Sequence, residues 1–464
     1  MTMLKVVGLM IGLWIGVAAT AQEQYVAADG AYTISIPPGW QLTEQATHLQ
    51  ISKNKVDITV LTIPTQAVDM AISAALARLE ITPGTLLSSA DAPLPNGVWE
   101  QHIYAADQIL TVALAQARDR LAHILVIVGE QAAVQAANPE LLQLLTSITF
   151  DETPPQPAYV DASSFAERAV NFGEAPYILS GVLSLPQGEG PFPAVVIVHG
   201  SGPHNRDGLL GPLTPYRDIA QGLSSRGIAV LRYDKRTFTY GASITIDAAF
   251  TIDSESTEDA AHAVAFLRQR ADIDSKRVFV LGHSQGAMLT PRILARAEAA
   301  AGGILLAAPA RPFSALVDEQ LAYIADVNPS ALASPSMAYM QDLADRFQQV
   351  AAGASYDDVF GESAAYHQSL ESIDAIAEAR EIAHPLLILQ GERDYQVTMQ
   401  DLARWQDAFA ADERVTFHAY PELNHMFMAS GDLSRLSIPQ DYALPAFVAA
   451  RVIADIATWV DAVD

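Results

Sequence analysis

Short apolar runs that alternate with helical segments constrain the fold of this chain most strongly. From residue 161 onward, the runs are four or five residues long and fall at 194–198, 229–233, 278–281, 304–308 and 386–389. Segments with helical periodicity fall at 216–226, 256–270, 286–300, 400–410 and 445–463. Short apolar runs of this kind are typical of parallel strands buried on both faces. The pattern predicts an α/β fold over residues 161–464, with a mostly parallel, doubly wound sheet.

One connection between the predicted strands is much longer than a crossover needs. Residues 311–383 separate the last two apolar runs, and their pattern is mainly helical. Long connections in compact domains are usually functional insertions. We therefore expect residues 311–383 to form a helical lid that shapes a substrate pocket.

The part of the chain before residue 151 follows a different pattern. Strand candidates fall at 31–36, 56–63, 97–104, 109–115 and 121–128, and helical periodicity falls at 67–79 and 139–146. This mixture predicts a smaller α+β domain over residues 22–150, in which no catalytic constellation is evident. The proline-rich residues 151–160 then read as a stiff linker between the two domains.

The N-terminus has the features of a secretory leader. Lys5 precedes an apolar run over residues 6–19, and Ala19-Thr20-Ala21 offers the small residues that a signal peptidase accepts. We therefore predict that residues 1–21 are a signal peptide and that the protein is secreted or periplasmic. The alternative is an uncleaved membrane anchor, but the run is shorter than the roughly 20 apolar residues that span a bilayer.

Composition excludes several classes of function. The formal net charge is -26, from 27 basic and 53 acidic residues, and such a surface repels nucleic acid and anionic membranes. We expect neither as a partner once the leader is removed. The chain has no cysteine, which excludes disulfides, thiolate metal sites and cysteine nucleophiles. It also lacks an H-E-x-x-H motif and a nucleotide-binding glycine loop, so we predict no metal and no cofactor.

A serine motif follows one of the apolar runs directly. Gly282-His283-Ser284-Gln285-Gly286 stands between a predicted strand and a predicted helix. This is the context in which G-x-S-x-G forms a nucleophile elbow, because glycines two residues on either side let the strand and helix backbones approach closely. We predict Ser284 as a catalytic nucleophile.

A serine hydroxyl needs a base within reach and an acid to orient that base. His425 follows a predicted strand at 415–420, and Asp394 follows the run at 386–389. Together with Ser284 they give the chain order Ser, Asp, His that is usual for such elbows. Glu392 is the alternative acid, being two residues closer to the end of its strand.

An oxyanion hole needs two N–H donors beside the nucleophile. One is the backbone N–H of Gln285, the residue after the serine. The other should come from the loop after the strand at 194–198, whose sequence is His-Gly-Ser-Gly-Pro at 199–203. We assign it to Ser201, with Gly202 as the alternative.

Taken together, these motifs resemble a known family. They are His199 to Asp207, Leu231 to Arg236, Gly282 to Gly286, Gly391 to Val397 and Leu423 to His425. In this order they resemble the bacterial α/β-hydrolase carboxylesterases related to the EstD group and the acyl-CoA thioester hydrolase/BAAT C-terminal family, over residues 165–464. The opening of the first domain resembles DcrB/PsbP-like domains of exported bacterial proteins.

The resemblance implies hydrolysis of small-molecule carboxylic esters, with short acyl groups, through an acyl-enzyme on Ser284, Asp394 and His425. The sequence differs from the family at Thr237, where the family usually has glycine. This difference could change the shape of the loop beside the site without affecting the triad. A thioesterase or an exported peptidase could use the same triad, and a binding protein with an inactive hydrolase domain is the alternative from another class. Charged residues that match the family have two interpretations, a salt-bridge network or a contact to a substrate carboxylate; they are Arg206, Asp207, Arg232, Asp234 and Arg236.

Overall fold

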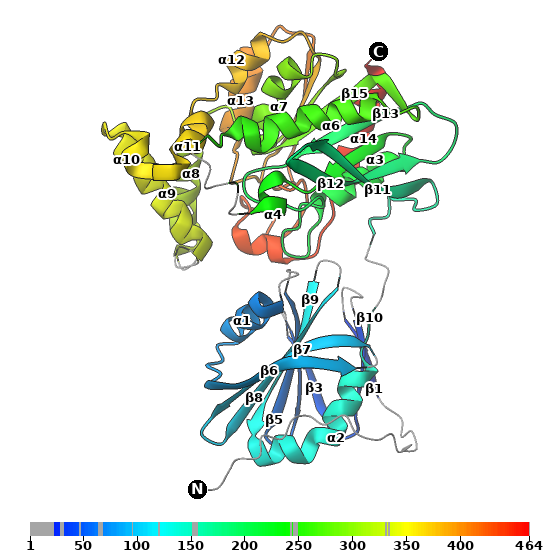
Figure 1. The fold of residues 1–464 in the computed structure, drawn as a ribbon, viewed down its shortest axis with the longest axis vertical. Helices are drawn as coiled ribbons and strands as arrows, with labels where there is room; N and C mark the ends of the chain where they lie inside the picture. Colours follow the sequence, from blue (N-terminus) through cyan, green and yellow to red (C-terminus); the bar gives the residue numbers. More distant parts are fainter. Residues whose placement is uncertain are drawn as a thin grey trace. The chain divides into compact units, whose positions relative to one another are not determined.

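The structure of this chain is a computed structural model. It describes residues 23–463, apart from 28–31, 46–47, 64–67, 95, 119–120, 151–155, 242–243, 245–248, 330–331 and 333–334. The predicted leader, residues 1–21, lies outside the described residues. The chain divides into two compact units, residues 1–155 and 156–464 (Figure 1).

The first unit is built on an antiparallel sheet of order β3-β4-β5-β9-β8-β7-β6. Its strands are β3 (Gln41–Glu44), β4 (Leu49–Lys53), β5 (Val56–Ile63), β6 (Thr85–Leu94), β7 (Gly97–Ala106), β8 (Ile109–Arg118) and β9 (Leu121–Glu130). A second, smaller sheet has the order β1-β2-β10 and is formed by β1 (Glu23–Val26), β2 (Tyr32–Ile36) and β10 (Thr149–Phe150).

Two helices cover opposite faces of the larger sheet in this unit. They are α1 (Val68–Arg78) and α2 (Gln131–Ser147). Along β8, Val112 and Leu114 pack in the core beneath α2, whereas Ala113 and Ala115 pack beneath α1. Because successive side chains of a strand point to opposite faces, the sheet is buried on both sides by different cores.

One helix of this unit differs from the sequence prediction. The pattern predicted a helix over 139–146, but α2 begins at Gln131 and continues through Pro139. A proline inside a helix removes one backbone hydrogen bond and costs about 3 kcal/mol. The buried residues Val134, Leu141 and Leu144 lie on both sides of Pro139, and their packing against the sheet offsets that cost.

The second unit contains a sheet of order β11-β12-β14-β13-β15-β16-β17-β18. Its strands are β11 (Phe165–Glu174), β12 (Tyr177–Pro186), β13 (Phe192–Val198), β14 (Ala229–Tyr233), β15 (Ile273–His283), β16 (Gly302–Leu306), β17 (Leu386–Gly391) and β18 (Val415–Tyr420). β12 pairs antiparallel with both of its neighbours. All other pairings are parallel, so the carboxyl ends of β13 to β18 meet along one edge of the sheet.

Helices cover both faces of this sheet (Figure 1). Those next to the sheet are α3 (Pro215–Ser224), α6 (Glu258–Arg268), α7 (Gln285–Arg296), α13 (Met399–Ala408) and α14 (Ala450–Ala462). Along β13, Val196 and Val198 share a core with α6, α7 and α13, whereas Val195 and Ile197 share one with α3 and α14. The predicted doubly wound sheet is therefore confirmed.

The long connection between β16 and β17 is helical, as predicted. It contains α8 (Phe313–Val327), α9 (Pro335–Ala351), α10 (Tyr356–Phe360), α11 (Ala364–Glu371) and α12 (Ala375–Arg380), with a 3-10 turn, η3, at Gly361–Ser363. The helices α8 to α11 build a core of their own, to which Val317, Leu343, Phe347 and Phe360 contribute. The described residues of this unit also form the short helices α4 (Arg236–Tyr240), the π-helix η1 (Asp253–Thr257) and the 3-10 helix η4 (Pro439–Ala443).

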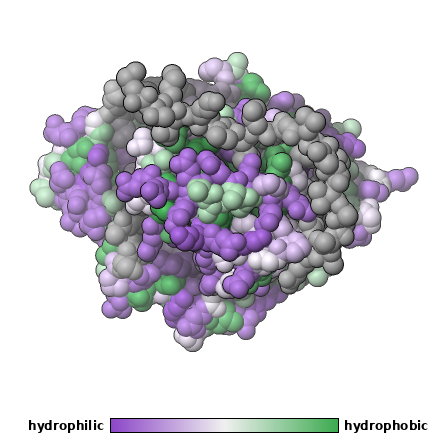
Figure 2. Space-filling model, turned by 90° about the horizontal axis from the view of Figure 1, so that it is seen from below, coloured by the Kyte–Doolittle hydropathy of each residue, from purple (hydrophilic) through white to green (hydrophobic). Residues whose placement is uncertain are grey.

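Hydrophilic side chains cover much of the described surface in view in Figure 2, and hydrophobic side chains form small separate patches there. Within the part of the chain that the structure describes, no helix is both long and apolar enough to cross a membrane.

Candidate active site

Ser284 stands at the turn between β15 and α7 with a strained backbone. Its φ is 55° and its ψ is -119°, a combination that is rare for residues other than glycine. A Cβ on Gly282 would lie 2.2 Å from the Gly286 carbonyl oxygen, and one on Gly286 would lie 2.4 Å from the Val198 oxygen. Only glycine fits at these two positions, so the predicted reason for the G-x-S-x-G spacing holds here.

Asp394 and His425 form a buried pair at the carboxyl ends of β17 and β18. The Asp394 Oδ2 lies 2.6 Å from the His425 Nδ1, and the two residues are 1% and 2% exposed. The backbone N–H groups of Gln396 and Val397 donate to the Asp394 Oδ1 at 2.7 and 3.0 Å. With the Nδ1 proton donated to the Asp394 carboxylate, the neutral imidazole has its Nε2 as the acceptor.

Glu392, the alternative acid, occupies a different place in the same loop. Its backbone N–H donates to the Tyr420 carbonyl oxygen at 3.0 Å, which continues the pairing of β17 with β18. Of these two carboxylates, Asp394 is the one that contacts His425.

A chain of buried hydrogen bonds joins the glycine loop to the back of His425. The Gly200 N–H donates to the Tyr216 hydroxyl (3.1 Å), and that hydroxyl donates to the His283 Nδ1 (3.1 Å). The His283 Nε2 then donates to the His425 carbonyl oxygen at 2.9 Å. Each direction is fixed, because the first donor is an N–H and the last acceptor is a carbonyl. Burial holds the pKa of His283 well below its usual range, which keeps its ring neutral.

The glycine loop passes close to the elbow. A Cβ on Gly200 would lie 3.3 Å from the Ser284 Cβ. Because the Gly200 N–H is bonded to Tyr216, the N–H groups of Ser201 and Gly202 are the ones that this loop could offer to a substrate. The Gln285 N–H is at the first residue of α7, where a helix has no partner of its own for it. Both predicted donor residues, Ser201 and Gln285, line the same cavity.

A buried ion pair contacts the backbone of the glycine loop. The sequence did not lead us to predict it. The Lys235 ammonium donates to the Gly200 carbonyl oxygen at 2.9 Å and lies 3.2 Å from the Glu255 carboxylate. Thr237 and Tyr366 donate to the same carboxylate at 2.9 and 2.8 Å. Lys235 lies in the motif from Leu231 to Arg236, so the sequence did offer a signal for it. Glu255 lies in the π-helix η1, which no sequence pattern predicts.

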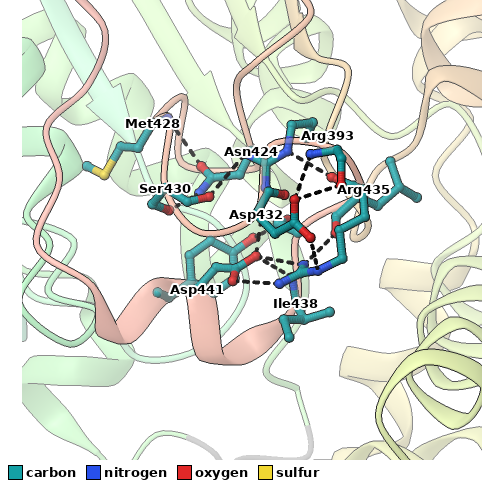
Figure 3. A network of polar contacts seen from close by, with 12 residues as sticks. Arg393, Asn424, Met428, Ser430, Asp432, Arg435, Ile438 and Asp441 are labelled. Atoms are coloured by element: carbon teal, nitrogen blue, oxygen red, sulfur yellow. Dashed lines mark hydrogen bonds and ion pairs between the residues drawn. The ribbon is translucent and has the colours of Figure 1, made fainter. Parts of the chain in front are cut away.

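A second missed residue, Arg393, joins the acid loop to the histidine loop. It is 4% exposed, and its guanidinium donates four hydrogen bonds to backbone oxygens. These oxygens belong to Glu422, Ser430, Asp432 and Arg435, at 3.2, 3.1, 2.7 and 2.8 Å. Figure 3 shows this network, in which Arg435 in turn pairs with Asp441. The contacts hold the segments on both sides of His425 against the loop that carries Asp394.

The charged residues that match the family form ion pairs, as the salt-bridge interpretation predicted. The pairs are Arg206 with Asp234, Arg232 with Asp207 and Glu167, and Arg236 with Asp259. A contact to a substrate carboxylate is not needed to explain them.

A cavity of about 800 Å³ opens beside the elbow. Its lining includes Ser201, Gly202 and Gln285 as well as residues of the 311–383 insertion. Within the described ranges, no group of three or more histidine or acidic side chains is placed to hold a metal ion.

A mostly parallel sheet with helices on both faces and a strained serine between a strand and a helix define the protein as an α/β-hydrolase. The chain belongs to the family described as serine aminopeptidase, S33, whose family model matches residues 190–432, just over half of the chain.

The chain is also similar to known esterases. It is 38% identical to Esterase EstD of Thermotoga maritima over 309 residues, which are 65% of this chain and 69% of that protein. Among solved structures, an esterase of Pyrococcus furiosus is 18% identical, with 56% of this chain and 84% of that chain covered and a TM-score of 0.39. An esterase of Pyrobaculum calidifontis is 15% identical, with 64% and 87% covered and a TM-score of 0.41. The resemblance to EstD-related hydrolases is confirmed.

Proposed function

We propose that this protein is a carboxylesterase that works through an acyl-enzyme on Ser284, with His425 as general base and Asp394 as the acid that orients it. The observation that carries the proposal is the 2.6 Å contact between the Asp394 Oδ2 and the His425 Nδ1, in a fold that carries a serine at a strained elbow. The same order of residues and the similarity to an esterase support it.

We propose the following reaction for these residues. The His425 Nε2 takes the hydroxyl proton as the Ser284 Oγ attacks the ester carbonyl carbon, and the N–H groups of Ser201 and Gln285 stabilise the oxyanion. The C–O bond to the alcohol breaks, and the alcohol leaves with the proton from His425. Water then attacks the acyl-serine by the same proton transfers and releases the acid. Asp394 stabilises the imidazolium in both steps.

The cavity favours an ester over the substrate of an aminopeptidase. An aminopeptidase must hold a free ammonium group, for which an unpaired carboxylate is the natural partner. The two carboxylates among the described residues that line the cavity are Glu255 and Asp342. Glu255 is paired with Lys235 and Asp342 with Arg346, at 3.2 and 2.8 Å.

A comparison of substrates tests the proposal. We expect p-nitrophenyl acetate and butyrate to be hydrolysed, while an acyl thioester and alanine p-nitroanilide react far more slowly. Ser284→Ala should abolish ester hydrolysis and leave the circular dichroism spectrum unchanged, because it removes only the attacking oxygen. Full ester turnover by the alanine variant, or faster cleavage of the anilide than of the esters, would contradict the proposal.

We further propose that the enzyme is exported and acts in the periplasm or outside the cell. The support is the leader pattern of residues 1–21, with Lys5, an apolar run and a small-residue cleavage site. The mass of the protein recovered from its native host tests this: a chain that begins at Gln22 is expected, and an intact Met1 to Asp464 chain would contradict it.

A further inference from the structure

The cavity beside the elbow is much larger than a short acyl group needs. Its volume is about 800 Å³, which is in the range of pockets that bury drug-sized ligands. If each carbon takes about the volume of a water molecule, about 30 Å³, a four-carbon acyl chain fills on the order of 100 Å³. Most of the cavity would stay empty around such a substrate.

The described walls of the cavity are rich in flat rings. The ring side chains that line it are Phe250, Phe313, Tyr339, Phe360, Tyr366 and His367. Phe250 and Tyr366 are stacked with an interplanar angle of 6°, and Phe360 and His367 are stacked with their centroids 4.2 Å apart. Faces of this kind pack well against another ring. Burial lowers the pKa of His367 to about 4, so its ring is neutral near pH 7.

The charges on the described walls cancel in pairs. Glu255 is buried and paired with Lys235, whereas Asp342 pairs with Arg346 where the two side chains are 56% and 41% exposed. A charged substrate group would be desolvated there without a partner, which is costly. A substrate anion would also meet a protein of net charge -26. The walls therefore favour an uncharged ligand.

One helix of the insertion closes this space. Tyr339, Met340, Leu343 and Arg346 of α9 all line the cavity. Their spacing along the helix places them on one face. The size of the cavity thus depends on the side chains of this face.

We propose that the cavity selects uncharged esters in which one side of the ester bond carries a bulky, ring-containing group. This inference rests on the proposed function and deepens it, because it replaces a short-chain preference with a preference set by ring size and charge. The group could stand on the acyl or on the alcohol side, and the substrates of the test separate the two.

The test compares two matched series of esters on the full-length enzyme. One series has a growing acyl side (methyl acetate, methyl phenylacetate, methyl 1-naphthylacetate), in which a CH2 group keeps the ring out of conjugation with the carbonyl. The other has a growing alcohol side (ethyl, benzyl and 1-naphthylmethyl acetate). In one of the two, kcat/KM should rise at least about tenfold from the smallest ester to the naphthyl ester. A carboxylate on the ring should remove that gain.

The variant Met340→Trp places an indole in the cavity. We compare kcat/KM for the naphthyl ester with kcat/KM for the smallest ester, and the ratio of the two should fall about tenfold or more in this variant. Gln348→Trp is the matched control, because Gln348 is exposed on the same helix and is not part of the cavity wall. Melting temperatures show whether both variants fold.

The outcomes separate the two proposals. Hydrolysis of p-nitrophenyl acetate with no gain for ring-bearing esters in either series, or an unchanged ratio in a folded Met340→Trp, would overturn this inference alone. If the enzyme hydrolyses no ester, the proposed function fails and this inference fails with it.

Discussion

At the scale of single residues, whether Asp394 or Glu392 is the acid of the triad depends on the direction in which one loop turns. After β17 the chain turns so that the backbone of Glu392 continues the ladder with β18, while Asp394 points to the His425 ring. Asp394→Asn should place the wrong tautomer before the serine and lower kcat by about 10⁴-fold, as in serine proteases. Glu392→Gln should change kcat little. Measuring kcat of both variants at the pH optimum tests this, and the reverse order of severity would make Glu392 the acid.

Tyr216 is predicted to position the site through the hydrogen bonds on both sides of its hydroxyl. Tyr216→Phe leaves the Gly200 N–H and the His283 Nδ1 unpaired, and an unsatisfied buried group costs about 1–3 kcal/mol. Because these groups belong to the oxyanion loop and the elbow, we expect kcat to fall about tenfold or more with little change in KM. Tyr420→Phe is the matched control, since its hydroxyl bonds to Asp455 on α14 instead. An equal loss of kcat in both variants would assign Tyr216 a general structural role.

These residues also show what a sequence can predict about a site. Ser284, Asp394 and His425 could be proposed because each follows a recognisable strand and the chain order is usual. Tyr216 could not, because its partner His283 is 67 residues away and no local pattern links them. Arg393 could not, because its partners are backbone oxygens, which leave no trace in side-chain composition.

At the scale of elements, burial decides what was predictable. β14 has the predicted bounds and β17 extends only two residues beyond its prediction, because buried apolar runs stand out in the sequence. β18 also has the predicted bounds, although two of its residues are exposed. β11 was missed, since this edge strand is largely exposed and carries polar residues. β6 was missed for the same reason. The insertion was predicted as helical, but its cavity depends on which faces of α9 and α11 line it, and helical periodicity does not specify that.

The link between the acid loop and the histidine loop gives a prediction at this scale. Arg393→Met removes the donor of four carbonyl oxygens, of which the Ser430 oxygen is in a buried hydrogen bond and the other three are in partly buried ones. We therefore expect the free energy of unfolding to fall by at least about 2 kcal/mol. Arg451→Met is the control, because Arg451 is 44% exposed and pairs with Glu422 at the surface, and its loss should cost under about 1 kcal/mol. Urea unfolding measures both, and equal stabilities of the two variants would contradict the structural role of Arg393.

At the scale of the whole molecule, the site residues and both cores of the eight-stranded sheet belong to the second unit. A chain that starts near residue 158 should therefore fold and keep its turnover of a small soluble ester. Circular dichroism and kcat on p-nitrophenyl acetate test this against the full-length protein. A truncated chain that folds but is inactive would mean that the first unit contributes to the site. The resemblance of that unit to DcrB/PsbP-like domains stays a prediction.

The central claim is that Ser284 forms the acyl-enzyme, and covalent labelling tests it most directly. A fluorophosphonate reacts with a serine that is activated by a neighbouring base, so the intact protein should gain the mass of one adduct and lose its esterase activity in the same proportion. After digestion, the adduct should lie on the peptide that contains Ser284, and Ser284→Ala should take up no label. A stoichiometric adduct on any other residue, or labelling of the alanine variant to the same extent, would contradict the account.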